Sequence, residues 1–181
     1  MDARNPAVGE AFALGGDVPA AGVGAAVGAA APFAYGFDAP APWYGVPEAE
    51  RGRRALLTTA ACTIDGRQFF VCGRIEVPVR GAADPFVWSV WVSVSERSFR
   101  RLLSPWDESG REEDLRVAGR LATVIPGYPD TLELNANVRP GPLGERPMVE
   151  LEATAHPLAA EQRLGISLER VEEIAQRMRP G

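Results

Sequence analysis

The pair Asp65-Gly66 constrains the fold most, because it lies between two β-rich runs in ALLTTAACTIDGRQFFVCGRIEVPV, residues 55–79. Asp-Gly is the pair that a two-residue β-hairpin turn favours, since both central residues of that turn adopt positive φ. β-branched and aromatic residues on both sides are typical of strands. The sequence therefore predicts an antiparallel hairpin at this point.

The turn also predicts where the two cysteines lie. A tight turn places Cys62 opposite Phe69, and because side chains alternate along a strand, Cys72 then falls on the other face with Phe70. Thiols on opposite faces cannot form a disulfide within one hairpin. We therefore expect two small packed thiols in a reducing compartment, which favours the cytoplasm.

Further strands and a few helices follow the hairpin. We expect a strand at about 86–94, a short helix capped by Ser95, strands at about 116–125, 132–139 and 147–153, and helices starting near Pro47, Pro157 and Ser167. With hairpins early and helices late, the sequence predicts an α+β fold. The sheet is expected to be mainly antiparallel, with a few short helices and a C-terminal helix.

Residues 1–32 are rich in Ala and Gly and include GVGAAVG, residues 22–28. A dinucleotide-binding loop needs a strand before the first glycine, a long helix after the last and an acidic residue about 20 positions on, and the sequence favours none of these. We interpret 1–32 as a flexible leader and 33–181 as a single α+β domain. The uncharged stretch 18–37 lacks Leu and Ile and contains two prolines, so no membrane segment or signal peptide is expected.

Composition excludes several chemistries. All 19 basic residues are arginine, so lysine-dependent Schiff-base, pyridoxal and P-loop sites cannot form. The net charge of −5 and the short basic clusters disfavour nucleic acid and anionic membranes as partners. One histidine and two cysteines without metal-ligand spacing predict no metal site, and we expect no cofactor.

Five blocks between about Phe33 and Ala175 resemble one bacterial family, the domain of unknown function 2199. They are YGFDAPAPW, CTIDGRQFFVCGRIEVPV, FVWSVWVSVSERSF, PGYPDTLELNANV and RPMVELEATAHPLAAEQRLGISLERVEEIA. The resemblance brings no established activity. Members of the family often begin with a zinc knuckle of the Cys-x-x-Cys type with histidine, and this chain has the Ala/Gly leader there instead. Zinc is therefore not expected from the resemblance.

His156 is the one side chain whose charge ordinarily changes near neutral pH. Because it precedes Pro157, its simplest role is to end the last strand and to help cap the next helix. The alternative is a general base, with Glu150, Glu152 or Asp130 orienting the imidazole.

Alternation along the strands predicts a polar face on the sheet. If the strands are neighbours, it combines Arg74, Glu76, Asn135, Asn137 and Arg139 with Glu150, Glu152 and Trp91. Its simplest interpretation is a solvated face of cross-strand ion pairs. Tyr128 in PGYPDT and Trp43 in FDAPAPWY lie in proline-aromatic loops, which serve either as stiff connectors or as recognition surfaces.

The first hypothesis is a cytoplasmic, non-catalytic binding or interaction module of the accessory or immunity type, which meets a partner protein or a small polar ligand. The alternative is a small hydrolase or isomerase that uses His156 with nearby carboxylates. A third hypothesis is a structural protein that self-associates through a sheet edge. Few catalytic groups and tryptophans near arginines favour the first.

Overall fold

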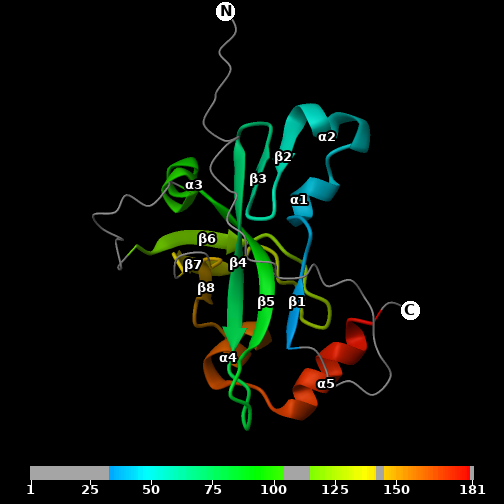
Figure 1. The fold of residues 1–181 in the computed structure, drawn as a ribbon, viewed down its shortest axis with the longest axis vertical. Coiled ribbons are helices and arrows are strands. Elements are labelled where there is room, and N and C mark those ends of the chain that lie inside the picture. Colours follow the sequence, from blue (N-terminus) through cyan, green and yellow to red (C-terminus); the bar gives the residue numbers. More distant parts are fainter. Residues whose placement is uncertain (1–32, 104–114, 142–144, 180–181) are drawn as a thin grey trace, which may run out of the picture.

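The computed structural model describes residues 33–103, 115–141 and 145–179, so the predicted leader at 1–32 lies outside the described residues. Helices and strands alternate irregularly along the chain (Figure 1). The strands are β1 (Ala34–Gly36), β2 (Ala55–Leu57), β3 (Ala61–Ile64), β4 (Gln68–Val77), β5 (Phe86–Val94), β6 (Val117–Leu121), β7 (Asn135–Arg139) and β8 (Met148–Leu151). The helices are α1 (Ala41–Tyr44), α2 (Glu48–Arg54), α3 (Glu96–Leu103), α4 (Pro157–Leu164) and α5 (Leu168–Arg177).

Five of the strands close into a barrel. They pair in the order β5-β6-β7-β8-β4, and β4 also pairs with β5. The α+β class is confirmed, but the expectation of a mainly antiparallel sheet is incomplete, because β4–β8 and β1–β5 are parallel. In a ring of five strands, alternating directions cannot continue all the way round. Four antiparallel pairings therefore require the closing pair, β4–β8, to be parallel.

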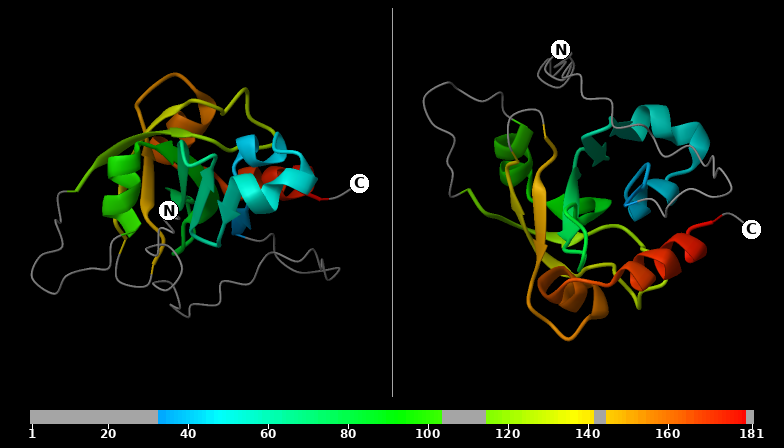
Figure 2. Two further views of the ribbon diagram at one scale, coloured as in Figure 1. Left: turned by 90° about the horizontal axis from the view of Figure 1, so that it is seen from above. Right: turned by 60° about the horizontal axis from the view of Figure 1, so that its bottom comes forward.

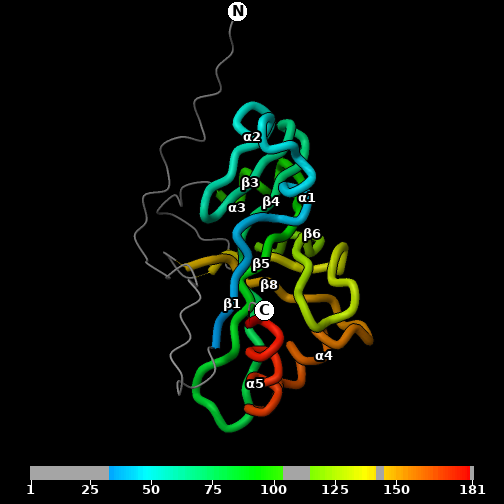
Figure 3. The backbone as a smooth tube through the Cα atoms, turned by 90° about the vertical axis from the view of Figure 1, so that its right-hand side faces the viewer, coloured from blue at the N-terminus to red at the C-terminus, as the bar shows by residue number. Residues whose placement is uncertain are grey.

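β4 and β5 run along most of the length of the molecule (Figures 1 and 3). α1, α2 and the β2–β3 hairpin lie at one end, and α4 and α5 lie at the other, below the barrel in Figure 2 (right). The main core fills the barrel and continues under α3, α4 and α5. A second, smaller cluster lies between β4, β5, β3 and the segment that contains α1.

The hairpin at Asp65-Gly66 is present, but its predicted register is wrong. Both residues have positive φ, at 53° and 61°, yet Ile64 pairs with Gln68 and Cys62 pairs with Phe70. Arg67 is an extra residue between the turn and the ladder, and one extra residue moves every later side chain to the other face. Cys62 and Cys72 therefore lie on the same face, in the second cluster, and not on opposite faces.

Both thiols are free and buried, each 1% exposed. Burial raises the pKa of Cys62 to about 12 and that of Cys72 to about 11, although the nearby Arg146 opposes the second shift. The folded protein therefore keeps both protons at pH values where an unfolded chain releases them, since the ordinary thiol value is 9.0. The stability that depends on the protonated thiols is complete below pH 9 and is lost as the pH rises toward these folded values.

We expect the free energy of unfolding to fall more steeply above pH 9 in the wild type than in a Cys62→Ala/Cys72→Ala variant. Urea unfolding at pH about 8 and about 10.5 measures how much the free energy of unfolding falls with pH in each protein. Because the two pH values are compared within one protein, the packing lost in the alanine variant does not affect the comparison. Equal slopes would show that the two thiols ionise alike in the folded and unfolded states.

The remaining predicted elements are confirmed in kind, with shorter bounds. Phe86, Trp88, Val90, Val92 and Val94 share the core face of β5, as alternation predicts. Ser95 accepts a hydrogen bond from the Ser98 amide at the start of α3, and Ser167 accepts one from the Arg170 amide at the start of α5. α5 buries Val171, Ile174 and Ala175, whereas Leu168, at its first position, is 47% exposed.

Candidate functional site

The strands that carry most of the predicted polar residues are neighbours. β8 lies between β7 and β4, Asn137 pairs with Glu150, and Arg74 pairs with Met148. Cross-strand partners share a face, so the polar residues lie together on the outside of the barrel. This charged face consists of Arg74, Glu76, Arg116, Asn135, Asn137, Arg139, Glu150 and Glu152.

Ion pairs connect the charged face across its strands. Glu150 bonds to Arg139 and lies 3.6 Å from Arg116, measured between a carboxylate oxygen and a guanidinium nitrogen. The Arg74 guanidinium lies 3.1 Å from Glu76 and 2.5 Å from Glu145. Most of these side chains are only partly buried, so each pair stabilises the fold modestly and the guanidinium groups remain accessible.

A groove of about 570 Å³ adjoins the charged face. It lies between the end of β4, the β4–β5 connection, β8 and α4. Glu76, Met148 and Glu150 belong to its walls, so two of the predicted polar residues border a concave surface. A second groove, of about 490 Å³, is lined by none of the predicted site residues.

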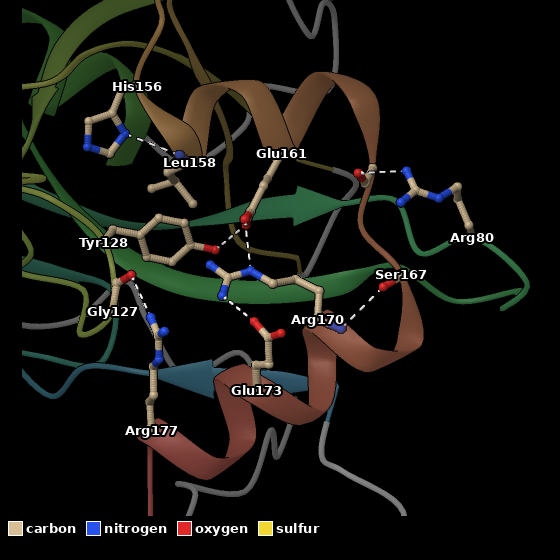
Figure 4. A network of polar contacts seen from close by, with 11 residues as sticks. Arg80, Gly127, Tyr128, His156, Leu158, Glu161, Ser167, Arg170, Glu173 and Arg177 are labelled. Atoms are coloured by element: carbon tan, nitrogen blue, oxygen red, sulfur yellow. Dashed lines mark hydrogen bonds and ion pairs between the residues drawn. The ribbon is translucent and has the colours of Figure 1, made fainter.

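His156 caps α4, as the simpler interpretation predicts. Its Nδ1 accepts a hydrogen bond from the Leu158 amide at 3.2 Å (Figure 4). Nδ1 is therefore unprotonated, and the neutral ring carries its proton on Nε2. Nε2 is buried and has no hydrogen-bond partner among the described residues.

The three carboxylates predicted to orient His156 have other partners. Glu150 bonds to Arg139. Glu152 accepts a hydrogen bond from the side-chain amide of Asn135 at 3.0 Å. Asp130 accepts one from the backbone amide of Leu132 at 3.0 Å. Within the part of the chain that the structure describes, His156 has no carboxylate partner. The predicted general base and its predicted orienting groups are thus not assembled into one site.

The Tyr128 side chain is held by contacts within the protein and is not exposed on a recognition loop. Its hydroxyl donates a hydrogen bond to Glu161 (Figure 4). Its ring packs edge-on against Trp88. Arg170 donates to Glu161 at 2.9 Å and lies 5.4 Å from the centre of the Tyr128 ring. Burial, and then the hydrogen bond to Glu161, raise the pKa of Tyr128 above its ordinary value. The PGYPDT loop is therefore a rigid connector held by α4 and α5.

Arg170→Ala is expected to lower the free energy of unfolding by about 1–3 kcal/mol, since it leaves a half-buried carboxylate without its charged donor. The side chains of Arg170 and Glu161 are only 21% and 20% exposed. Arg177→Ala is the matched control, because Arg177 is on the same helix and bonds to the same loop at Gly127, but is exposed. It is expected to change stability by less than about 0.5 kcal/mol. Equal losses in urea unfolding would contradict the assigned role of Arg170.

Trp91 differs from expectation, whereas Trp43 packs as one of its two predicted interpretations allows. Trp91 is 1% exposed, and its indole donates to the Phe37 carbonyl at 2.8 Å, because the segment before α1 and the β2–β3 hairpin cover this end of the barrel. It is a core residue and not part of the charged face. Trp43 is half-buried against the second cluster, with the Arg51 guanidinium 5.5 Å from its ring centre.

Residues of α4 and of the β4–β5 connection shape the site but were not predicted from the sequence. Gln162 lines the groove and bonds to the backbone of β8, and Glu161 holds Tyr128. Neither residue belongs to a recognisable motif, and polar residues at their positions in a helix are typical of a solvent-exposed helix face. Asp84, on the β4–β5 connection, was likewise without a signal other than its charge in a proline-flanked loop.

The fold and the charged face define a small α+β protein built on a five-stranded barrel. The chain belongs to the family described as an uncharacterized protein conserved in bacteria, domain of unknown function 2199, whose family model matches residues 26–166. The resemblance found in the sequence is thereby confirmed. Neither the curated proteins nor the solved structures gave a significant match.

Two further properties of the described residues bear on possible functions. No group of three or more His, Cys, Asp or Glu side chains in residues 33–103, 115–141 and 145–179 is arranged to hold a metal ion. None of the helices in these ranges has both the length and the apolar character that a bilayer crossing requires.

Proposed function

We propose that this protein is a cytoplasmic, non-catalytic binding module of the accessory or immunity type, and that the charged face and its adjoining groove receive a partner protein. One observation carries the proposal: Arg74, Glu76, Arg139 and Glu150, from three strands, gather beside one concave surface. Arginine is among the residues enriched at protein interfaces, and ion pairs at the rim contribute mainly to specificity.

The rigid support behind the face favours the same function. β4 is bonded along its length to β5, β8 is bonded to β7, and the Gln162 side chain of α4 bonds to the backbone of β8. A preformed face loses little conformational entropy on binding, which raises the affinity that a modest interface can reach.

The proposal is tested by affinity capture from the native host, with a tagged wild type and an Arg116→Glu/Asn135→Arg variant. Both substituted side chains are exposed, so folding should be retained. Arg116→Glu reverses one charge of the face, and Asn135→Arg adds a positive charge at a second position. The expected result is a partner captured by the wild type and lost with the variant. Arg53→Glu on α2, an exposed residue away from the charged face, is the matched control and should retain the partner. Capture that is insensitive to the charged-face variant would contradict the proposal.

The alternative, a hydrolase or isomerase, has one observation in its favour: the buried Nε2 of His156 has no hydrogen-bond partner in the described part of the chain. His156→Ala alone cannot test it, because loss of the helix cap costs about 0.5–2 kcal/mol. His156→Asn keeps a capping oxygen and removes the imidazole. If a substrate is turned over by the wild type and not by His156→Asn at an unchanged melting temperature, the enzyme alternative is favoured.

A further inference from the structure

The barrel is incompletely closed where β4 meets β8. The two strands share a single registered pair, Arg74 with Met148, although β4 continues to Val77 and β8 continues to Leu151. Beyond that pair, the Gln162 side chain bonds to β8 in place of a strand. Its amide donates to the Val149 carbonyl at 2.7 Å, and its oxygen accepts from the Leu151 amide at 2.8 Å.

The groove lies over this open seam. Its floor is mainly apolar and is formed by Val79, Ala82 and Leu151, with Met148 at one side. Glu76, which lines the groove, pairs with Val87 of β5 on one side of β4 and has no registered partner on the side that faces β8. An extended chain laid there meets apolar side chains and the backbone of Glu76. Beyond Glu76, the edge of β4 is occupied by Ile166, whose amide donates to the Pro78 carbonyl at 2.8 Å.

The charged residues that line the groove favour an occupant with positive charge. The lining of the groove includes three carboxylates and one cation: Glu76, Asp84 and Glu150, and Arg163. Glu76 and Glu150 already share arginines of the charged face, whereas Asp84 is exposed and has no ion pair among the described residues. A carboxylate without a partner beside two others attracts a guanidinium or an ammonium group.

From these observations we infer that the groove between β4, β8 and α4 docks an extended, arginine- or lysine-bearing segment of a partner protein. The inference rests on the proposed binding function and names the partner's chemistry at that site. The segment lies over the apolar floor, and its cationic side chains meet Asp84 and Glu76.

The test is an NMR titration of the full chain with a blocked heptapeptide of alternating arginine and threonine. Amide shifts are expected in Glu76, Ala82, Asp84, Met148 and Gln162, with an affinity that falls as salt is added. An alternating glutamate and threonine peptide should not bind. Shifts located elsewhere, equal binding of the acidic peptide, or no shifts would overturn the inference.

Two variants and one small cation test whether the carboxylates of the groove bind the peptide specifically. Asp84→Asn/Glu76→Gln should weaken peptide binding at least about fivefold, since it removes two charges of the groove. Glu172→Gln, an exposed α5 residue outside the groove, is the matched control and should bind like the wild type. If spermidine produces the same shifts with the same affinity, the groove is a site for small cations and the docking inference fails.

The two proposals can fail separately. If host capture depends on the charged face but the peptide does not bind the groove, the binding module stands and the docked segment is wrong. If the peptide binds but host capture does not respond to Arg116→Glu/Asn135→Arg, the groove is a docking site and the charged face is not its extension.

Discussion

Gly73→Ala is expected to destabilise the protein by about 1–3 kcal/mol or to prevent folding, the cost of overpacking a filled interior. A Cβ built at Gly73 would lie 2.5 Å from a methyl group of Val149 and 2.9 Å from the Pro147 carbonyl oxygen. That carbonyl accepts the hydrogen bond from Arg74 that joins β8 to β4, so it cannot move away without opening the barrel. Thermal and urea unfolding measure the loss.

Gly52→Ala provides the opposite control. Gly52 lies within α2, and a Cβ there would have no atom within 4 Å. Alanine in a helix interior is favoured over glycine by about 0.5–1 kcal/mol, so this variant should be more stable than the wild type. A Gly73→Ala variant as stable as the wild type would show that β8 does not approach β4 as closely as described.

Trp88→Ala is expected to lower the free energy of unfolding by about 3–5 kcal/mol, because it leaves a large cavity in a filled core. Trp88 is 0% exposed and lies among the rings of Tyr35, Phe37, Phe86 and Tyr128. These rings come from β1 and its continuation, β5 and the PGYPDT loop, so one side chain joins three segments that are distant in sequence.

Two further variants locate the origin of that loss. The Trp88 indole nitrogen has no hydrogen-bond partner in the described residues, so Trp88→Phe removes volume without breaking a hydrogen bond and should cost less than Trp88→Ala. Trp43→Ala, at a half-buried tryptophan, should also cost less. Equal losses at positions 43 and 88 in urea unfolding would indicate that burial at Trp88 is less complete than described.

The sequence predicts local structure here better than it predicts how local pieces meet. Alternation in β5 and the caps at Ser95, His156 and Ser167 depend on near neighbours in the chain, and they are confirmed. The hairpin register depends on a distant partner. Arg54, at the end of α2, binds the Asp65 carboxylate at 2.8 and 2.7 Å and accepts the Asp65 amide at its carbonyl. This contact holds the turn, and no feature near Asp65 predicts it.

The same distinction applies to the candidate site. The face on which each polar residue lies could be predicted, because side chains alternate along each strand. That the strands are neighbours was a condition of the prediction, and the structure shows that it is met. The groove could not be predicted, since it arises where a five-stranded ring closes with a parallel pair and Gln162 occupies the gap. Trp91 was misplaced for a related reason: alternation gives its face correctly, but the covering segment before α1 is set by tertiary structure.

Burial along β4 also determines which positions of this strand are free to vary. From Phe70 to Val77, every residue is buried except Arg74 and Glu76. The two positions belong to the charged face, and Glu76 borders the groove. Mutation at the six buried positions is opposed by packing, whereas mutation at 74 and 76 changes charge with little effect on the barrel. The charge at these two positions can therefore change while the same fold is kept.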